Sequence, residues 1–471
     1  MNCLADWLAA GARRHPERPA LCLPHATLSH AELAAVARHA AARLQAALAG
    51  AGETPPIVAV AGTASELVIA ALACSRLGLG LLPLDPQTTD ARWAALRAQG
   101  GIHLRRLPPP LPETAIAPPH AAASGDAPAT ACGTAAPAIA LVIATSGSEG
   151  TPKAVMLTPD NLDAAARASN ARLPLGAGDL WLACLPLHHI GGISILYRCL
   201  RAGATLQLHA GFDAATVAAA LTHQAVTHLS LVPAMLARLL DLDVRPPASL
   251  RHALIGGAAL SRPLFERARA AGWPLCPSWG MSECAAQAAT LVAPGDDWHE
   301  GAVGPLLDGL ACRVDETGRL CLRGPQVMAG YLNPDLAPGH GLAADGWLRT
   351  ADLGGIDARG HLRVHGRADD VFVSGGVNVH PLEVESCLAA CPGVADVAVT
   401  ALPDPVWGDA LVALVVGNAL PESVRDWGRR HLPPAQRPRR VLGVPRLPRN
   451  AMGKIERAAL RALARDCREA S

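Results

Sequence analysis

The chain has 471 residues, 50% of them apolar, and a formal net charge of only +1. This length exceeds one ordinary domain and predicts two or more domains with large cores, while a near-neutral chain without a basic run argues against nucleic acid as its main partner. The 13 cysteines include no Cys-x-x-Cys pair and no zinc-type Cys/His spacing, which is typical of reduced core cysteines in a cytoplasmic protein.

The first part of the chain predicts alternating helices and strands. Ser29 and Glu32 have the spacing of a capping box, which opens an Ala/Leu-rich helix that runs to about Leu48. The next segment predicts a βαβ unit, with strand, helix and strand at Ile57–Ala61, Ser65–Leu77 and Leu79–Leu84. Charged residues interrupt this apolar stretch, so we expect no membrane span. Residues 105–137 are rich in proline and alanine and predict a loose surface connection.

A Gly- and Ser-rich loop at residues 145–153, Thr-Ser-Gly-Ser-Glu-Gly-Thr-Pro-Lys, follows the apolar run Ala138–Ala144. The run predicts a buried strand. The loop can turn several backbone N–H groups toward one point, and its hydroxyls and Lys153 add donors and a positive charge, so we expect it to bind phosphate. It is not a Walker A loop, because Pro152 precedes the lysine and Ala154 follows it.

Strands and helices alternate again after this loop. Candidate strands lie at Trp181–Leu185, Ala204–His209, Val226–Leu231, His252–Gly256 and Pro274–Pro277. Candidate helices lie at Asp213–His223, Ala234–Leu240 and Arg262–Ala271. This alternation predicts mostly parallel sheets that are covered by helices.

The pattern changes near Leu310 and again near residue 366. Short strands with Gly turns predict a small antiparallel, barrel-like unit, at Ala311–Val314, Arg319–Leu322 and His361–His365. A separate α+β pattern follows, with a helix and two strands near Pro381–Ala390, Val394–Ala401 and Leu411–Val416. We therefore expect an α/β fold with a large N-terminal domain at 1–366 and a small, mobile α+β C-terminal domain at 367–471.

Glycine-rich and charged segments follow several of these elements. They are, in chain order, Leu185-Pro-Leu-His-His-Ile-Gly-Gly192, Gly256-Gly-Ala258, Ser278-Trp-Gly-Met-Ser-Glu283, Trp347-Leu-Arg-Thr-Ala-Asp352, Gly366-Arg-Ala-Asp-Asp370, Ser374-Gly-Gly-Val-Asn-Val379 and Pro448-Arg-Asn-Ala-Met-Gly-Lys454. Together with the loop at 145–153, and in this order, they resemble the adenylate-forming superfamily of acyl- and aryl-CoA synthetases, adenylation domains and luciferases. The resemblance covers nearly the whole chain, from about Asp6 to Arg457.

The resemblance implies a nucleotide site for ATP and Mg²⁺. Its members would be the phosphate loop residues Thr145, Ser146, Gly147, Ser148, Gly150, Thr151 and Lys153, the adenine contacts Gly256, Gly257, Ala258, Trp279 and Gly280, the phosphate and Mg²⁺ contacts Ser282 and Glu283, and the ribose contacts Asp352 and Arg367. A carboxylate is a hard ligand that suits Mg²⁺, which agrees with the role implied for Glu283.

The resemblance also implies a two-step reaction in which the small domain rotates. A carboxylic acid would attack the α-phosphate of ATP, giving an acyl-adenylate and pyrophosphate, and Lys454 would stabilise the charge that develops. Asp369 would be the hinge, and the segment Ser374, Gly375 and Gly376 would then approach a pantetheine tunnel. The thiol of CoA, as co-substrate, would take the acyl group and release AMP.

Three segments narrow the choice of acid, namely Leu185–Leu200, His228–Leu240 and Ala285–Gln287. They look closest to the o-succinylbenzoate–CoA ligases of menaquinone synthesis. This implies that Arg198 pairs with a second carboxylate of the substrate, that Ser230 lies near the same pocket, and that His189 lines and gates the acyl site. Five positions depart from the superfamily. Trp279 replaces a usual tyrosine and loses its hydroxyl, and Glu149 stands where threonine or serine is usual. Ala154 and Ala351 replace glycines, and His188 replaces an aromatic residue.

Other interpretations stay open. Arg198 could be a helix-surface charge, and Ser230 could be a core hydroxyl bonded to backbone. His188 and His189 lack a third ligand at metal spacing, which argues against a metal pair. The chain could be another aryl- or acyl-CoA ligase, a stand-alone adenylation enzyme that loads a carrier-protein thiol, or a non-catalytic nucleotide-binding homologue. These patterns do not set the oligomeric state, and a homodimer stays open.

Overall fold

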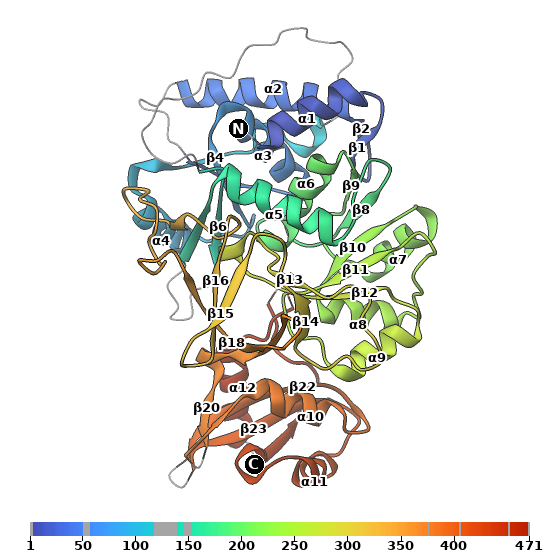
Figure 1. Cartoon of the computed structure of the whole chain (residues 1–471), viewed down its shortest axis with the longest axis vertical. Coiled ribbons are helices and arrows are strands. Elements are labelled where there is room, and N and C mark those ends of the chain that lie inside the picture. Colours follow the sequence, from blue (N-terminus) through green and yellow to red (C-terminus); the bar gives the residue numbers. More distant parts are fainter. Residues whose placement is uncertain are drawn as a thin grey trace.

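Two helix-covered sheets and a small antiparallel sheet form the upper part of Figure 1, and a fourth sheet with its own helices forms the lower part. A computed structural model of the chain describes residues 3–49, 57–116, 139–145, 153–374, 376–404, 407–450 and 453–469. Within these residues, no helix is both long enough and apolar enough to cross a bilayer. The predicted α/β fold with a large N-terminal part and a small C-terminal part is confirmed.

The first sheet has six strands in the order β17-β7-β6-β4-β3-β5. Their bounds are β3 (Ile57–Ala61), β4 (Gly80–Leu84), β5 (Leu104–Leu107), β6 (Leu141–Thr145), β7 (Lys153–Leu157) and β17 (Gly330–Tyr331), and the nearby helices are α1 (Cys3–Arg14), α2 (His30–Ala49), α3 (Ala64–Leu77) and α4 (Asp90–Gly100). The predicted βαβ unit is confirmed, because β3 and β4 pair in parallel. The capping box is also confirmed: the backbone N of Ser29 donates to Glu32 Oε2 at 2.8 Å, and the backbone N of Glu32 donates to Ser29 Oγ at 3.2 Å.

One prediction for this sheet is wrong. The proline-rich segment 105–137 was expected to be a loose connection throughout, yet its start forms β5, which pairs in parallel with β3. The apolar residues Leu104 and Leu107 flank two arginines there, and the sheet edge supplies the pairing that the short segment lacks by itself. Residues 117–138 lie outside the described part of the chain.

The second sheet has eight strands in the order β13-β12-β11-β10-β8-β9-β1-β2, and pairing is parallel from β1 through β12. Its strands are β1 (Pro19–Cys22), β2 (Thr27–Ser29), β8 (Leu180–Ala183), β9 (Thr205–Leu208), β10 (His228–Leu231), β11 (His252–Ile255), β12 (Leu275–Trp279) and β13 (Ala289–Thr290), with helices α5 (Pro159–Arg172), α6 (Ile190–Ala202), α7 (Ala214–His223), α8 (Pro233–Asp241) and α9 (Arg262–Ala270). The mostly parallel arrangement predicted from the sequence is therefore confirmed. Parallel pairing places the carboxyl ends of β8, β10, β11 and β12 at one edge, where ligands bind in open α/β sheets.

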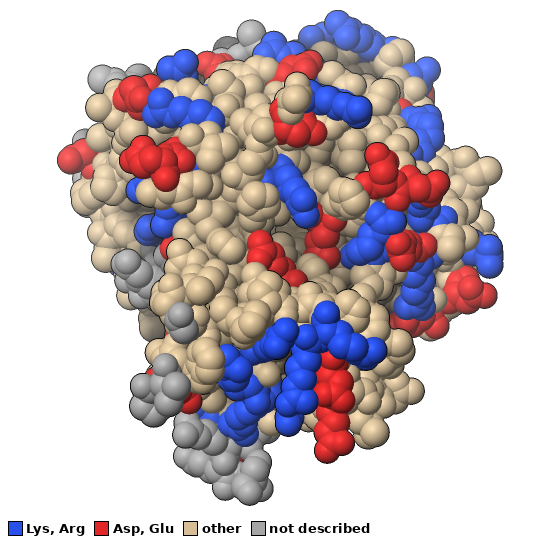
Figure 2. All heavy atoms as spheres, turned by 60° about the horizontal axis from the view of Figure 1, so that its bottom comes forward, with Lys and Arg blue, Asp and Glu red and all other residues tan. Residues whose placement is uncertain are grey.

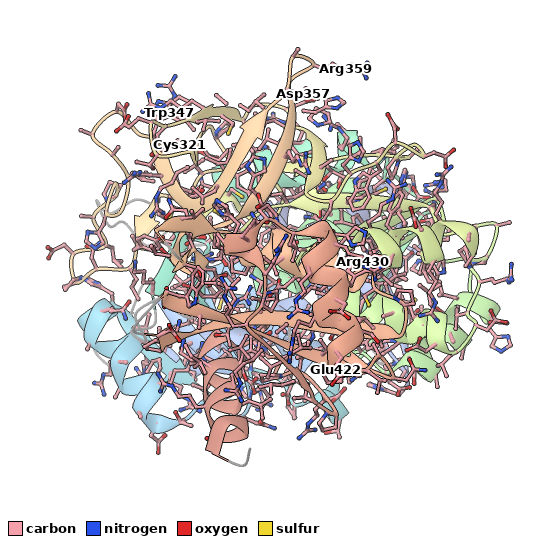
Figure 3. The ribbon with its side chains drawn as sticks, turned by 90° about the horizontal axis from the view of Figure 1, so that it is seen from below. Cys321, Trp347, Asp357, Arg359, Glu422 and Arg430 are labelled. Carbon is pink, nitrogen blue, oxygen red and sulfur yellow. The ribbon has the colours of Figure 1, made fainter. Side chains whose placement is uncertain are left out.

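The small third sheet is antiparallel, in the order β14-β19-β18-β16-β15. Its strands are β14 (Ala302–Pro305), β15 (Ala311–Val314), β16 (Arg319–Arg323), β18 (Leu348–Ile356) and β19 (His361–Arg367). Viewed from below, the turn between β18 and β19, marked by Asp357 and Arg359, projects at the rim of the molecule (Figure 3). Asp352, in the middle of β18, and Arg367, the last residue of β19, lie opposite each other in the register.

The C-terminal unit begins after β19 with the 3-10 turn η4 (Ala368–Asp370). It contains β20 (Phe372–Ser374), β21 (Val377–Val379), β22 (Val394–Asp404), β23 (Gly408–Gly417) and β24 (Arg440–Gly443), with α10 (Pro381–Ala389), α11 (Pro421–His431) and α12 (Arg457–Glu469). Glu422 and Arg430 mark α11 in Figure 3. Val384, Val399 and Leu411 belong to a separate buried core in this unit. The predicted division at residue 366 falls at the end of β19 and stays a prediction.

Candidate active site

The site lies where the carboxyl ends of the parallel strands meet the third sheet and the C-terminal unit. Figure 2 shows a hollow near the centre of this face, with acidic and basic side chains gathered around it. The residues that follow β8, β10, β11 and β12 reach this edge, as do Asp352 and Arg367 from the third sheet. The fold therefore brings the segments that follow these strands together with Asp352 and Arg367, whereas no contact places the segment 374–379 at this edge among the described residues.

Trp279, Asp352 and Arg367 form a hydrogen-bonded group. The indole N–H of Trp279 donates to Asp352 Oδ2 at 2.8 Å, and Arg367 Nη1 lies 3.8 Å from Asp352 Oδ1. Arg367 also donates from Nη2 to Asp369 Oδ2 at 3.2 Å. Trp279 is only 8% exposed, so its ring is largely covered. The indole N–H of Trp279 therefore fixes the orientation of the Asp352 carboxylate.

Glycines keep the backbone close to this group. A Cβ at Gly280 would overlap the carbonyl oxygen of Ala286, and a Cβ at Gly256 would lie 2.7 Å from Ser278 Oγ. Gly257 has φ of +78°, a conformation that favours glycine. Gly256 and Gly280 therefore allow close packing against neighbouring protein atoms, and the adenine contact implied for Gly256, Gly257 and Ala258 stays a prediction.

Lys454 reaches the site from the C-terminal unit. Its turn is closed by two bonds, because the backbone N of Asn450 donates to the carbonyl O of Lys454 at 2.9 Å and the backbone N of Lys454 donates to Asn450 Oδ1 at 3.0 Å. Within this turn Gly453 packs at the end of β10, where an added Cβ would lie 3.0 Å from Val232 Cγ2. The turn of the C-terminal unit therefore contacts the large part of the molecule.

The ammonium of Lys454 lies among charged residues of the large part of the molecule. Desolvation and the charge of Arg367 lower the pKa of Lys454, while Asp352 and Glu283 act in the opposite direction. These interactions place Lys454 among the residues predicted to hold the nucleotide.

Glu283 lies in the 3-10 turn η3 (Ser282–Cys284). Its Oε1 accepts a hydrogen bond of 2.9 Å from the hydroxyl of Tyr331, and Lys153 Nζ lies 5.4 Å from the centre of the Tyr331 ring. Thr145 Oγ1 donates to the carbonyl O of Lys153 at 3.1 Å, which closes the base of the loop between them.

Some predicted site residues lie outside the described part of the chain. They are Ser146, Gly147, Ser148, Gly150 and Thr151 of the loop, together with Glu149 and Gly375. In the residues that are described, no group of three or more His, Cys, Asp or Glu could hold a metal ion. The single carboxylate of Glu283 still fits Mg²⁺, because this ion keeps several waters and takes oxygens from substrate phosphates.

Arg198 is buried beside Trp181 and Ser230. It is 3% exposed on α6, and its guanidinium carbon lies 5.3 Å from the centre of the Trp181 ring. The indole N–H of Trp181 donates to Ser230 Oγ at 3.1 Å. Burial lowers the pKa of Arg198 to about 10, and no Asp or Glu of the described residues forms an ion pair with it. The alternative of a helix-surface charge is therefore wrong for Arg198, and Ser230 bonds a side chain instead of backbone.

His189 precedes α6 and faces both its neighbour and Lys454. Its ring centre lies 4.5 Å from that of His188, whose Nε2 is 3.5 Å from Asp85 Oδ2. Burial, His188 and Lys454 lower the pKa of His189 to about 4. The imidazole is therefore neutral near pH 7, so it can line an acyl site without adding charge.

Comparisons with known proteins match nearly all of this chain. The sequence model of the AMP-binding enzyme family matches residues 8–332, and that of the AMP-binding enzyme C-terminal domain matches residues 383–454. The chain belongs to the AMP-binding enzyme family. This confirms the resemblance inferred from the sequence segments.

Two curated relatives of this AMP-binding enzyme carry the same name. The 2-succinylbenzoate–CoA ligase of Bacillus subtilis is 32% identical over 475 residues, covering 97% of each chain. That of Bacillus licheniformis is 32% identical and covers 97% of this chain and 99% of the relative.

Solved structures agree with this likeness. The o-succinylbenzoate CoA synthetase of B. subtilis in complex with its acyl-adenylate intermediate superposes with a TM-score of 0.83 at 29% identity, covering 97% of this chain and 98% of that one. The same enzyme in complex with ATP and magnesium superposes with a TM-score of 0.82 at 29% identity, covering 97% of this chain and 99% of that one. The ATP-bound MatB of Rhodopseudomonas palustris superposes with a TM-score of 0.84 at 26% identity, covering 98% of this chain and 99% of that one.

Sequence reasoning on this AMP-binding enzyme missed Tyr331 and Trp181. Tyr331 comes from a two-residue strand far from Glu283 in the chain, so only the folded structure reveals their contact. A signal existed in composition, because the chain has only two tyrosines. The sequence predicted a strand at Trp181. It gave no sign of the bond from Trp181 to Ser230, because the two residues lie on different strands, β8 and β10, that are neighbours only in the folded sheet.

Replacing Trp279 by phenylalanine should raise the KM for ATP about 5- to 10-fold with a smaller change in kcat. The variant keeps an aromatic ring but removes the N–H that donates to Asp352 Oδ2. Without this hydrogen bond the Asp352 carboxylate can rotate, which weakens its expected contact with the ribose. Steady-state kinetics with varied ATP measure the effect. Trp273→Phe is the matched control, since it also loses one indole bond, to the carbonyl O of Val244, at a distance from the site. An unchanged KM in Trp279→Phe would contradict the role of this bond.

Proposed function

We propose that this AMP-binding enzyme is a 2-succinylbenzoate–CoA ligase, which adenylates an aromatic dicarboxylic acid and passes the acyl group to CoA. The observation that carries the proposal is Arg198, a buried guanidinium without a carboxylate partner among the described residues. A buried charge without a partner is unfavourable by roughly 3–5 kcal/mol. The second carboxylate of the acid would supply the partner that Arg198 lacks. The shared name of the two Bacillus relatives supports the same substrate.

In the first half-reaction, the carboxylate that becomes activated attacks the α-phosphorus of ATP, and pyrophosphate leaves. Lys454 would hold the carboxylate and the α-phosphate together and stabilise the charge that develops between them. Asp352 would accept bonds from the ribose hydroxyls, and its orientation is set by Trp279 and Arg367. Bound Mg²⁺, held by Glu283 and the phosphates, would neutralise phosphate charge.

In the second half-reaction, the thiol of CoA attacks the acyl carbon, and AMP leaves. Lys454 would first withdraw by rotation of the C-terminal unit about Asp369, bringing the turn of Ser374 and Gly376 to the site. In the present arrangement, this turn joins β20 and β21, whose Val373 and Val377 are 51% and 49% exposed. The position of Lys454 near Asp352 and Glu283 supports an arrangement for the first half-reaction.

A panel of acids tests the proposal. Pyrophosphate release should be fastest with 2-succinylbenzoate and much slower with benzoate or succinate, and CoA should be needed for continued turnover. Turnover confined to monocarboxylic acids would refute the proposed substrate. Adenylate formation followed by transfer only to a carrier-protein thiol would favour a stand-alone adenylation enzyme. Absence of pyrophosphate with every acid would favour a non-catalytic homologue.

The lowered pKa of Lys454 predicts the pH dependence of adenylation. The ammonium is the active form, and a lowered pKa means that it loses its proton at lower pH than an ordinary lysine. The adenylation rate should therefore fall on the alkaline side, beginning below the usual lysine range. Lys454→Arg should lack this alkaline decline, because guanidinium keeps its proton. Single-turnover rates across pH measure both profiles, and an identical decline in the two enzymes would contradict the assignment.

A further inference from the structure

One short segment, residues 328–331, holds Glu283 at two points. The backbone N of Met328 donates to the carbonyl O of Glu283 at 2.9 Å, and the hydroxyl of Tyr331 donates to Glu283 Oε1 at 2.9 Å. The same segment pairs with β7, the strand that starts at Lys153, so that Tyr331 lies opposite Val155. Segment 328–331 therefore ties the carboxylate of Glu283 to the strand that leaves the phosphate loop.

The ring of Tyr331 is confined from two sides. Lys153 Nζ lies 5.4 Å from the ring centre, within the range of cation–π attraction. Gly341, with φ of +88°, packs against the ring, and a Cβ at this position would overlap it. These contacts fix the position of the ring, and with it the hydroxyl that donates to Glu283 Oε1.

We propose that Tyr331 is a positioning residue of the adenylation half-reaction, whose hydroxyl fixes the carboxylate of Glu283 and whose ring supports the ammonium of Lys153. The bond occupies Oε1 of Glu283 and leaves the second oxygen for Mg²⁺ on the phosphates of ATP. The proposal rests on the proposed function, because it requires ATP to be the nucleotide substrate. Tyr331 itself contacts neither ATP nor the acid in this account; it acts through Glu283 and Lys153.

Tyr331→Phe removes the hydroxyl and keeps the ring, so this variant tests the contribution of the hydroxyl alone. In this variant, the Mg²⁺ concentration for half-maximal pyrophosphate release should rise about 10-fold and the adenylation rate should fall about 10-fold, as expected for the loss of a bond to a charged group. The KM for the acid, and the conversion of supplied acyl-adenylate with CoA, should stay unchanged. Tyr331→Leu also removes the ring, and should in addition raise the KM for ATP.

Tyr197→Phe is the matched control, because Tyr197 is the other tyrosine of the chain and lies in α6, where its ring makes a T-shaped contact with that of Trp7. It should keep the Mg²⁺ dependence of the unchanged enzyme. A normal Mg²⁺ dependence in Tyr331→Phe would overturn the proposal, and so would equal losses in both half-reactions, which mark a merely structural role. If the unchanged enzyme releases no pyrophosphate with any acid, the proposed function falls first, and the role of Tyr331 falls with it.

Discussion

Lys454→Ala should lose adenylate formation by roughly 1,000-fold, yet still convert supplied acyl-adenylate and CoA to thioester at nearly the normal rate. The reason is geometric. The turn Asn450–Lys454 carries the ammonium to the site from the C-terminal unit, where Asp352 and Glu283 act on its pKa. In the proposed mechanism, the charge would be needed only while the carboxylate and the α-phosphate react, and it would leave the site when the unit rotates.

Two assays with the same variant make this test selective. Acid-dependent pyrophosphate release measures the first half-reaction, and thioester formation from synthetic acyl-adenylate measures the second. Lys153→Ala is the matched control, because Lys153 and Lys454 are the only lysines of the chain. It should mainly raise the KM for ATP, since Lys153 lies beside Tyr331 at the phosphate loop. Equal losses of both half-reactions in Lys454→Ala would refute the assigned role.

Arg198→Met should raise the KM for 2-succinylbenzoate roughly 100-fold while leaving kcat much less affected. The guanidinium is proposed to bind the carboxylate that does not react, and a charge-assisted pair in a buried site is worth about 1.5–3 kcal/mol. Methionine fills a similar volume without charge, so the variant should fold at least as well as the parent. Steady-state kinetics with varied acid measure the change, and thermal unfolding checks the fold.

Arg201→Met is the control from the same helix. Arg201 already has a partner, since its Nε donates to Asp163 Oδ1 at 2.8 Å. Its positive charge is therefore balanced within the protein, and we expect no role in binding the acid. Its KM should stay near that of the unchanged enzyme. An unchanged KM in Arg198→Met would end the proposal that Arg198 selects a dicarboxylic acid.

Local patterns predicted the regular elements of the large part well. Capping residues and apolar runs gave α2, β3 and β4 because each is set by neighbours in sequence. The same rules failed at β5, where an existing sheet edge recruits a short segment that has little preference of its own. They also gave no sign of β17, which has two residues and exists only through its pairing with β7.

Site residues could be predicted from the sequence where one short motif contains the residue. Asp352 and Arg367 were inferred separately, and the register of β18 and β19 places them opposite each other. The contacts between segments were not predictable, because they depend on tertiary distance. The bond from Trp279 to Asp352 and the bond from Tyr331 to Glu283 are both of this kind.

The identity of the products tests the central claim most directly. The enzyme is incubated with 2-succinylbenzoate, ATP, Mg²⁺ and CoA, and the mixture is analysed by mass spectrometry together with pyrophosphate determination. The account predicts 2-succinylbenzoyl-CoA, AMP and pyrophosphate in equal amounts. Formation of ADP and phosphate, or consumption of ATP without any thioester of this acid, would contradict it.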